Sequence, residues 1–407
     1  MHQLITQDSV RHYSNPQVLR GAPIGERQRT ILSQEAMAEA REEIRTWPGY
    51  SPTPLVELSG LARAADIGCL YYKDEAKRFG LNSFKALGGA YAVLRLLKQH
   101  LPEGVSSADL LAGKHREEAA RITVCCATDG NHGRSVAWGA QMFGAHCVIY
   151  LHPTVSQGRE DAISRFGAEI RRVPGNYDDS VRQVAKDAKA NGWFVVSDTS
   201  YPGYMTVPRD VMQGYTVMID EAVQQLSEPP THCFVQGGVG GLAAATLAQL
   251  WEAYGPDRPR VIVVEPDKAA CLFESARVGS PTAVHGELDT LMAGLACGEV
   301  SLLAWEVLED GIDDFMTISD EAAVEAMKLL AKGIGGDAPL VAGESAVAGL
   351  AGLLIARQNP ALSEALDLDA DSRVLLIGSE GATDEEVYQQ LVGRPSAEIE
   401  AEAREHA

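Results

Sequence analysis

Short apolar runs alternate along the chain with longer segments in which apolar residues recur every three or four positions. The short runs, bounded by turn residues, are typical of buried strands, and the longer periodic segments are typical of amphipathic helices. The pattern predicts strands at residues 69–73, 122–126, 147–151, 169–173, 193–196, 233–235, 261–265 and 374–377. It predicts helices at residues 90–99, 178–190, 211–226, 242–253 and 320–332. Such alternation indicates an α/β protein with mostly parallel sheets covered by helices on both faces.

Size and charge limit the class of protein. The chain has 407 residues, of which 45% are hydrophobic, enough for a sizeable core and about two domains. It has no run of about 20 apolar residues and no charged start followed by an apolar segment. We therefore expect a cytoplasmic protein without a membrane partner. The formal net charge of −21 also disfavours nucleic acids as partners.

The cysteines do not form a recognisable framework. They are odd in number and lack Cys-x-x-Cys spacing, which argues against disulfides and against a metal site. Most lie in apolar, strand-like runs, so we expect reduced and buried thiols. The seven are Cys69, Cys125, Cys126, Cys147, Cys233, Cys271 and Cys297.

A lone lysine stands between an aromatic residue and small residues in Asn82-Ser83-Phe84-Lys85-Ala86-Leu87-Gly88-Gly89. A lysine amine becomes a good carbonyl nucleophile where apolar surroundings lower its pKa, and pyridoxal phosphate chemistry requires such a residue. On its own the motif is weak, because most such lysines lie at the surface. Lys85 is thus a candidate Schiff-base lysine that needs support from other motifs.

Two polar loops between a strand and a helix give that support. Thr128-Asp129-Gly130-Asn131-His132-Gly133 follows the apolar run at 122–126 and precedes a helical pattern. Gln236-Gly237-Gly238-Val239-Gly240-Gly241 follows the run at 233–235 and opens an alanine-rich helix. Glycines let the backbone approach a ligand closely, and the N–H groups at a helix N-terminus can hold a phosphate.

The second loop also permits a dinucleotide-binding interpretation. Gly238, Gly240 and Ala243 fit a Gly-x-Gly-x-x-Ala fingerprint, and Glu265 ends a strand at about the distance expected for a ribose ligand. Nicotinamide binding would leave the lysine segment and the Asp129 loop unexplained.

Taken in order, these motifs resemble those of the fold type II pyridoxal phosphate enzymes, the family of tryptophan synthase β and the threonine and serine dehydratases. Ser83-Phe84-Lys85, the Asp129 to Gly133 turn, residues 237–241 and Ser379-Glu380-Gly381 carry the resemblance. It implies pyridoxal 5'-phosphate as cofactor, two α/β domains and a homodimer. We expect residues 1–90 and 205–392 to form a large cofactor-binding domain, residues 91–204 a small domain, and residues 393–407 a C-terminal tail.

The same resemblance implies roles for individual residues. Lys85 would bind the cofactor covalently, Asn131 would contact its ring oxygen, and Ser379 or Thr383 would meet its pyridine nitrogen. The C-terminal motif reads Glu380-Gly381-Ala382-Thr383 where Glu-Gly-Asp-Thr is usual, so Glu380 also stays a candidate for the nitrogen. The phosphate would lie on Gly237, Gly238, Val239, Gly240 and Gly241.

Within the family, the chain is most similar to the diaminopropionate ammonia-lyases. Dehydratases typically follow the lysine with Arg-Gly and place a small residue before Gly-Asn-His, where this chain has Leu87-Gly88 and Asp129. Residues 78–92, 198–201, 212–215, 297–299 and 343–345 also resemble lyase segments. The similarity implies elimination of ammonia from D- and L-2,3-diaminopropionate, giving pyruvate and ammonia via aminoacrylate.

A substrate with two ammonium groups requires a carboxylate near its β-nitrogen, and a nearby acid can also move protons. Asp129 and Asp198 are the candidates for these catalytic roles, beside Lys85. The expected substrate-binding residues are Ser83, Thr128, Asp129, Asp198 and Glu344. The rivals are a serine/threonine or hydroxyaspartate dehydratase of the same fold and a catalytically silent amino-acid or cofactor-binding protein.

Each of these residues also has a plain structural interpretation. Asp129 could cap the following helix, and Asp198 could be a turn residue. His132 is expected to be a structural neighbour of its turn, and Glu344 could either be a satisfied polar residue or line the pocket. Tyr177, Tyr201 and Tyr204 are expected to pack in the core.

Overall fold

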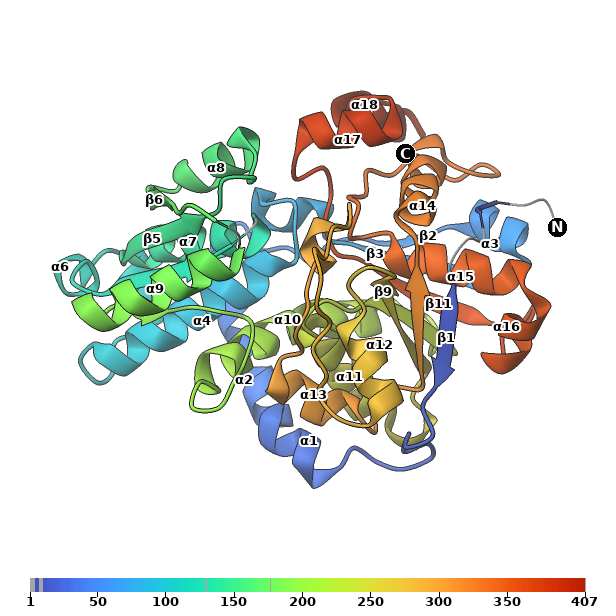
Figure 1. Cartoon of the computed structure of the whole chain (residues 1–407), viewed down its shortest axis with the longest axis horizontal. Coiled ribbons are helices and arrows are strands. Elements are labelled where there is room, and N and C mark those ends of the chain that lie inside the picture. Colours follow the sequence, from blue (N-terminus) through green and yellow to red (C-terminus); the bar gives the residue numbers. More distant parts are fainter. Residues whose placement is uncertain (1–3, 7–9, 129, 176, 407) are drawn as a thin grey trace.

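Two separate sheets organise the molecule (Figure 1). The computed structural model describes residues 4–6, 10–128, 130–175 and 177–406. The large sheet has seven strands in the order β1-β10-β9-β8-β11-β3-β2, and the small sheet has four in the order β6-β5-β4-β7. All neighbours are parallel except the two edge strands of the large sheet, β1 and β2, which are antiparallel.

The strands are β1 Arg11–Ser14, β2 Leu55–Glu57, β3 Cys69–Asp74, β4 Thr123–Ala127, β5 His146–Leu151, β6 Glu169–Arg172, β7 Phe194–Val195, β8 His232–Gln236, β9 Arg260–Pro266, β10 Asp314–Ile318 and β11 Arg373–Gly378. The α-helices are α1 Glu26–Ile31, α2 Gln34–Ile44, α3 Ser59–Ala65, α4 Lys85–His100, α5 Ser107–Leu111, α6 Arg116–Ala119, α7 Asn131–Phe143, α8 Gln157–Ser164, α9 Tyr177–Asn191, α10 Thr206–Gln225, α11 Gly241–Tyr254, α12 Cys271–Val278, α13 Leu302–Leu308, α14 Asp320–Lys332, α15 Ala348–Gln358, α16 Pro360–Ala365, α17 Glu385–Val392 and α18 Ser396–His406. The 3-10 helices are η1 Glu75–Gly80, η2 Gly255–Asp257 and η3 Ala293–Leu295.

The central strands of the large sheet are apolar on both faces because helices cover both. In β8 and β9, Val235 and Val263 pack into the cluster that contains α11, whereas Phe234 and Val264 pack into the cluster that contains α15. Successive side chains of a strand point to opposite faces, so a doubly covered strand has a continuous apolar run rather than an alternating one. This explains why the sequence shows these strands so clearly.

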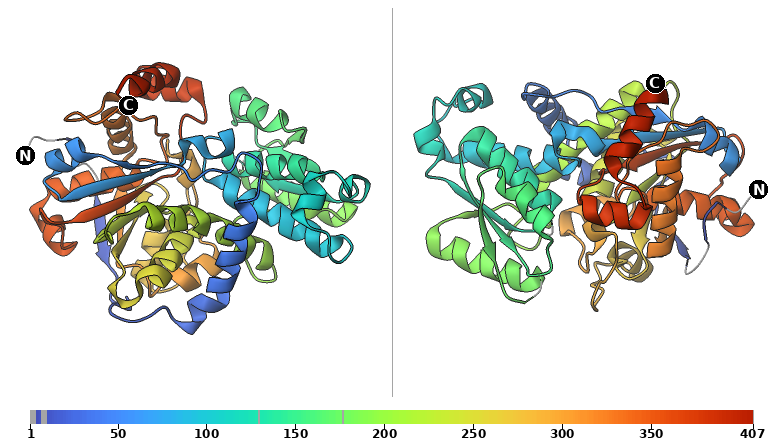
Figure 2. Two further views of the ribbon diagram at one scale, coloured as in Figure 1. Left: turned by 180° about the vertical axis from the view of Figure 1, so that it is seen from behind. Right: turned by 90° about the horizontal axis from the view of Figure 1, so that it is seen from above.

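The small sheet is built in the same way. Cys125, Val148 and Tyr150 pack against Val184 and Ala188 of α9. The opposite face, towards α7, belongs to the main hydrophobic cluster, and α7 in turn packs on α4. Figure 2 shows the small sheet and its helices as a lobe beside the large sheet in both views. The carboxyl ends of β4, β7, β8 and β11 thus supply loops to one region between the sheets.

Every strand and helix expected from the sequence is present, with ends shifted by a few residues. Three strands were not anticipated: the antiparallel edges β1 and β2, and β10. The segment at 106–118, for which no element was expected, contains α5 and most of α6, and the expected tail contains α18. Ile399 of α18 is fully buried in the hydrophobic cluster that contains α14 and α15, so this helix is packed against the fold rather than solvated on all sides.

A buried ionic network fixes the segment that leads to Lys85. Arg78 of η1 donates to both Glu75 and Glu221, and Lys73 Nζ lies 2.8 Å from Glu221 Oε2. Thr53 donates to Glu75 from the preceding loop. Because each buried charge has an opposite partner, the network ties β3, η1 and α10 together at the base of the site.

Within the part of the chain that the structure describes, no helix is both long and apolar enough to cross a membrane.

Candidate active site

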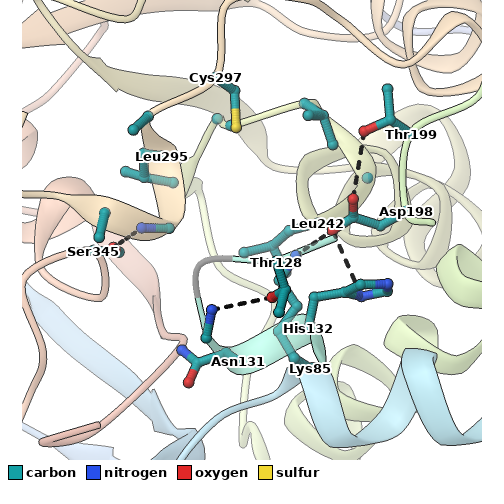
Figure 3. A pocket seen from close by; sticks show the side chains of 18 of the residues that line it. Lys85, Thr128, Asn131, His132, Asp198, Thr199, Leu242, Leu295, Cys297 and Ser345 are labelled. Carbon is teal, nitrogen blue, oxygen red and sulfur yellow. Dashed lines mark hydrogen bonds and ion pairs between the residues drawn. The ribbon is translucent and has the colours of Figure 1, made fainter. Parts of the chain in front are cut away.

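A cavity of about 450 Å³ lies where the loops of the two sheets meet (Figure 3). Two expected site residues, Ser83 and Gly240, do not line it, and Asp129 lies outside the described residues. The expected residues that do line it are Lys85, Thr128, Asn131, Asp198, Gly237, Gly238, Val239, Gly241, Glu344, Ser379 and Thr383. Motifs up to about 300 positions apart in the sequence therefore form one site.

Lys85 is the first residue of α4, and its side chain ends in an ion pair. Lys85 Nζ lies 2.5 Å from Asp198 Oδ2, and it lies 5.5 and 5.8 Å from the ring centroids of Phe84 and Tyr215. Burial alone would lower the pKa of Lys85, but the negative charge of Asp198 outweighs it and raises that pKa well above its usual value. The expectation that apolar surroundings lower this pKa is therefore wrong beside the Asp198 carboxylate.

Asp198 collects three neighbours after β7. Figure 3 shows Lys85, His132 and Thr199 converging on its carboxylate. His132 Nδ1 lies 3.9 Å from Asp198 Oδ2, and Thr199 Oγ1 donates to Asp198 Oδ1. Burial would raise the pKa of Asp198, but the charge of Lys85 and then His132 holds it well below its usual value. Asp198 is thus a partly buried anion with an ion-pair partner and not a plain turn residue.

His132 is held from its other side. Its Nε2 lies 2.8 Å from the Val196 carbonyl oxygen, which can only accept, so Nε2 carries a proton. Burial lowers the pKa of His132, while the negative charge of Asp198, which Nδ1 faces, acts in the opposite direction. The expected role as a neighbour of the turn is confirmed, with contact to the ion pair in addition.

The Asn131 loop presents an oriented amide. Thr128 Oγ1 accepts the N–H groups of Gly130 and Gly133 at 3.0 Å, which fixes the turn. Asn131 begins α7; its Nδ2 donates to Glu380 Oε2 at 2.5 Å, and its Oδ1 accepts from Arg134 at 2.6 Å. With one hydrogen of the amide nitrogen used, the other is available to a ligand in the cavity.

The glycine loop has the shape of an anion cradle. Gly238 and Gly240 have φ of +69° and +100°, a conformation that favours glycine. A Cβ at Gly237 would collide with Glu265, and one at Gly240 would lie 3.0 Å from Leu308 Cδ1. No side chain caps α11 within the described chain, so its first N–H groups are left for a ligand. Gly240 supports this loop from behind the cavity wall.

Glu265 does not face a ribose site. Both of its carboxylate oxygens accept backbone N–H groups at the start of α12, from Leu272 at 3.0 Å and from Phe273 at 2.7 Å. Its side chain is fully buried under Gly237, and burial raises its pKa to about 8. The acidic residue of the dinucleotide interpretation is therefore used inside the fold.

The two remaining acids form a pair across the cavity from Asp198. Glu344 Oε1 lies 3.2 Å from Arg159 Nη2, and Glu380 Oε1 accepts the N–H of Ser345. Burial, followed by the charge of Glu380, raises the pKa of Glu344 to about 7. Glu380 is thus bound to Asn131 and to Ser345, and it lines the cavity together with Ser379 and Thr383.

Ser83 is buried beside Lys85 and does not line the cavity. It is 2% exposed, its backbone pairs with Glu380, and its Oγ accepts the N–H of Lys85 at 3.3 Å. The expected contact with substrate is replaced by a contact with the lysine's own backbone.

The tyrosines correct another expectation. Tyr177 and Tyr201 are 42% and 51% exposed and line the cavity, so they do not pack in the core. Tyr204 donates to the Val195 carbonyl and accepts from Ser197, and its ring stacks on Tyr201 at 4.9 Å. Tyr201 and Tyr204 flank a two-residue turn. The Tyr201 ring faces the cavity, whereas Tyr204 is bonded to the backbone after β7.

Sequence reasoning missed two residues of the site. Arg159, on α8, reaches across to Glu344 and Asp384. Tyr215, on α10, faces Lys85 although it lies 130 positions away. Tyr215 belongs to residues 212–215, which resemble a lyase segment, but the resemblance indicated no role for it. Arg159 has no motif around it.

Comparisons with known proteins agree with this site. A family model described as pyridoxal-phosphate dependent enzyme matches residues 46–380. The chain is 41% identical over 372 residues to a diaminopropionate ammonia-lyase of Escherichia coli strain K12, covering 89% of this chain and 92% of that protein. The crystal structure of holo diaminopropionate ammonia lyase from Escherichia coli is similar with a TM-score of 0.87 and 38% identity, covering 95% of this chain and 97% of that chain. A crystal structure of the same enzyme in complex with an aminoacrylate-PLP azomethine reaction intermediate has a TM-score of 0.85 and 38% identity, covering 95% and 97%.

Proposed function

The chain belongs to the pyridoxal-phosphate dependent enzymes, and from this premise we propose that its site eliminates ammonia from 2,3-diaminopropionate. The α-proton and the β-amine leave, which gives ammonia and 2-aminoacrylate. Water then converts aminoacrylate to pyruvate and a second ammonia. Both enantiomers, D and L, are substrates.

The observation that carries this proposal is the Lys85–Asp198 ion pair inside the same cavity as the glycine loop. One cavity thus holds an amine, an anion and a glycine loop that can bind phosphate. The proposed reaction uses all three. A hydroxy amino acid would need no buried anion beside the leaving group, whereas a β-ammonium group does.

The residues present fit pyridoxal phosphate. The collision of a Cβ at Gly237 and the positive φ of Gly238 and Gly240 mark a backbone cradle at the N-terminus of a long helix. Lys85 would bind the cofactor, Asn131 its ring oxygen, and Ser379 or Thr383 its pyridine nitrogen. When bound, the cofactor supplies the electron sink for the negative charge left at the α-carbon.

Two bases divide the enantiomers. With the carboxylate and β-amine held alike, the α-protons of the D- and L-isomers point in opposite directions, and one group cannot easily reach both. Lys85 Nζ takes the α-proton of the L-isomer, and Asp129, two positions before Asn131 in the sequence, takes that of the D-isomer. Asp198 binds the β-ammonium and Thr128 helps to orient the substrate. Arg159 holds Glu344 in the cavity wall. The Glu344 carboxyl, whose pKa is about 7, can accept a further hydrogen bond from an ammonium group of the substrate.

Product stoichiometry tests the proposed reaction against its rivals. The purified protein is supplied with 2,3-diaminopropionate, serine, threonine and hydroxyaspartate, and ammonia and keto acid are both measured. Diaminopropionate should give two ammonia molecules for each pyruvate, at the highest kcat/KM. Faster release from serine, threonine or hydroxyaspartate, with one ammonia for each keto acid, would make the chain a dehydratase. Release from none would favour a binding protein.

We also propose a homodimer in the cytoplasm, with residues 1–90 and 205–392 as the large domain and 91–204 as the small one. Helix α4 runs without a break across residues 90 and 91, so the two domains would share it. Light scattering on the purified protein should give twice the chain mass of 43.6 kDa. A mass of one chain would remove the dimer from the proposal and leave the chemistry unchanged.

A further inference from the structure

Tyr215 of α10 is locked against the lysine segment. Its ring lies 4.6 Å from that of Phe84, centroid to centroid, and it is 1% exposed. A Cβ at Gly88 would collide with its Cε1, and one at Gly241 would lie 3.8 Å from its Cε2. The ring therefore fills a slot between α4 and α11, with one edge on the cavity. Packing fixes where its hydroxyl can point.

That hydroxyl is buried, and no described residue stands in good hydrogen-bond geometry to it, although Lys85 is close enough to act on its pKa. Lys85 Nζ carries three hydrogens and, among the described residues, donates to Asp198 Oδ2 alone. A partly buried ammonium thus faces a buried hydroxyl that has no partner, and leaving such groups unpaired is costly.

We propose that Tyr215 is a positioning residue for Lys85, its hydroxyl oxygen being the second acceptor that holds the Lys85 ammonium inside the cavity. This inference rests on the proposed role of Lys85 in the reaction. After Lys85 Nζ has taken the α-proton, the ammonium needs acceptors that keep it over the substrate. Asp198 alone cannot do this while it also binds the β-ammonium.

The groups that face Lys85 come from four elements. Asp198 follows β7, His132 belongs to α7, Tyr215 to α10, and Cys297 to the loop after η3. Burial raises the pKa of Tyr215, so the phenol is protonated over the working pH range. It can therefore donate to the neutral amine or accept from the ammonium. The second bond is the stronger because it is assisted by charge. Removing the hydroxyl should thus favour the neutral amine.

The test measures how fast the full chain, freed of cofactor, captures added pyridoxal phosphate across a range of pH, with borohydride trapping. Only the neutral amine attacks the aldehyde, so the capture rate at a given pH below the pKa of Lys85 is proportional to the fraction of neutral amine. A hydrogen bond to a charged group is worth roughly one pKa unit. Tyr215→Phe should therefore capture the cofactor about tenfold faster than wild type at each neutral or mildly alkaline pH.

A gain in capture rate with a loss in turnover distinguishes positioning from damage. In the same variant, holding cofactor, kcat on 2,3-diaminopropionate should fall by about tenfold. Tyr388→Phe is the matched control, because Tyr388 is also buried with a hydroxyl that no described residue bonds, on the distant helix α17. It should leave the capture rate and the turnover as in wild type.

A wild-type capture rate in Tyr215→Phe, or slower capture at every pH, would overturn the proposal. Lys85→Ala separates this failure from a failure of the proposed function. If Lys85→Ala traps no cofactor while Tyr215→Phe keeps the wild-type capture rate, Lys85 retains its role and only that of Tyr215 is lost. If Lys85→Ala still traps cofactor, the role of Lys85 itself is wrong.

Discussion

At the scale of single residues, the Lys85–Asp198 pair governs the site. Burial favours the neutral amine, but a carboxylate at 2.5 Å favours the ammonium, and the carboxylate wins. Asp198 therefore holds the ammonium form of Lys85 in place within the site. In the proposed reaction, the β-ammonium of diaminopropionate would be a second cation for the same carboxylate.

Lys85→Ala should abolish the covalent link to pyridoxal phosphate that borohydride can reduce, while the fold survives. The side chain ends in the cavity, so its loss leaves the helix intact. Turnover should fall by at least about a thousandfold. Peptide mapping after reduction is the measurement, with Lys98→Ala, a half-buried lysine on the same helix, as control. Cofactor found on another lysine would refute the assignment.

Asp129→Asn should abolish turnover of D-2,3-diaminopropionate by about 10² to 10⁴-fold, spare more of the L-isomer and leave the cofactor spectrum intact. Asp198→Asn should impair both isomers, because the β-ammonium is common to both. Steady-state rates of both variants on each pure enantiomer test these expectations. Equal losses on D and L in Asp129→Asn would replace the two-base division by a shared binding role.

The sequence could predict those residues whose chemistry is written in a local motif. Lys85, Asn131 and the glycine loop are of this kind, because each stands in a short stretch with its own backbone requirement. Tyr215 and Arg159 are of another kind. Their roles follow from which helices pack together, and neither a tyrosine in a buried helix nor an arginine in a short exposed one has a pattern that reveals it.

At the scale of elements, the proposal places the cofactor's phosphate at the turn from β8 into α11. Gly238→Asp would strain a backbone at φ +69° and put a negative charge into the cradle. We expect pyridoxal phosphate affinity to fall by about a hundredfold or more, and Gly240→Asp to do the same. Gly393→Asp is the matched control, since its φ is +87° and nothing lies within 4 Å of a Cβ there. Equal cofactor occupancy in all three, measured by absorbance, would contradict the phosphate role.

The end of β9 should make stability fall as pH rises. Glu265 has an ordinary pKa of 4.5 in the unfolded chain and about 8 in the fold, where burial dominates. Between these values the folded state binds more protons than the unfolded state, so stability decreases from about pH 5 to pH 8 and then levels off. Each pKa unit is worth about 1.4 kcal/mol, so we expect a loss on the order of 2–4 kcal/mol.

Urea unfolding of wild type and Glu265→Gln at pH 5.5 and 8.5 measures this. The variant should lose some stability at both values, because one N–H of α12 is left without its acceptor, but it should lack most of the difference between them. Glu274→Gln, on α12, should keep the wild-type difference in stability between the two pH values. An unchanged difference in Glu265→Gln would show that Glu265 titrates elsewhere.

Elements were predictable where burial on both faces writes a continuous apolar run, as in β8, β9 and β11. The edge strands β1 and β2 were missed because a short strand with one exposed side has little pattern of its own. β10 was missed for another reason: it begins with Asp314, a buried carboxylate paired with Arg260 and His12. Its partners lie far along the chain, so the sequence shows only a charge where a strand begins.

At the scale of the whole molecule, the site exists because the two sheets aim the carboxyl ends of their strands at one another. Arg159 with Glu344 and Ser156 with Asp384 join α8 of the small sheet to the large sheet across the cavity, and Asn131 with Glu380 does the same from α7. The network around Arg78 and Glu221 anchors the opposite side. The order of motifs predicted two α/β units, but these cross-links depend on how the units pack.

The measurement that tests the central claim most directly is the absorption spectrum of the purified protein before and after addition of 2,3-diaminopropionate. We expect a band near the edge of the visible range from cofactor bound to Lys85. Diaminopropionate should replace this band within the time of one turnover, and it should return once the substrate is consumed to pyruvate and ammonia. A protein without the band, or one whose band answers to serine or threonine but not to diaminopropionate, would contradict the account.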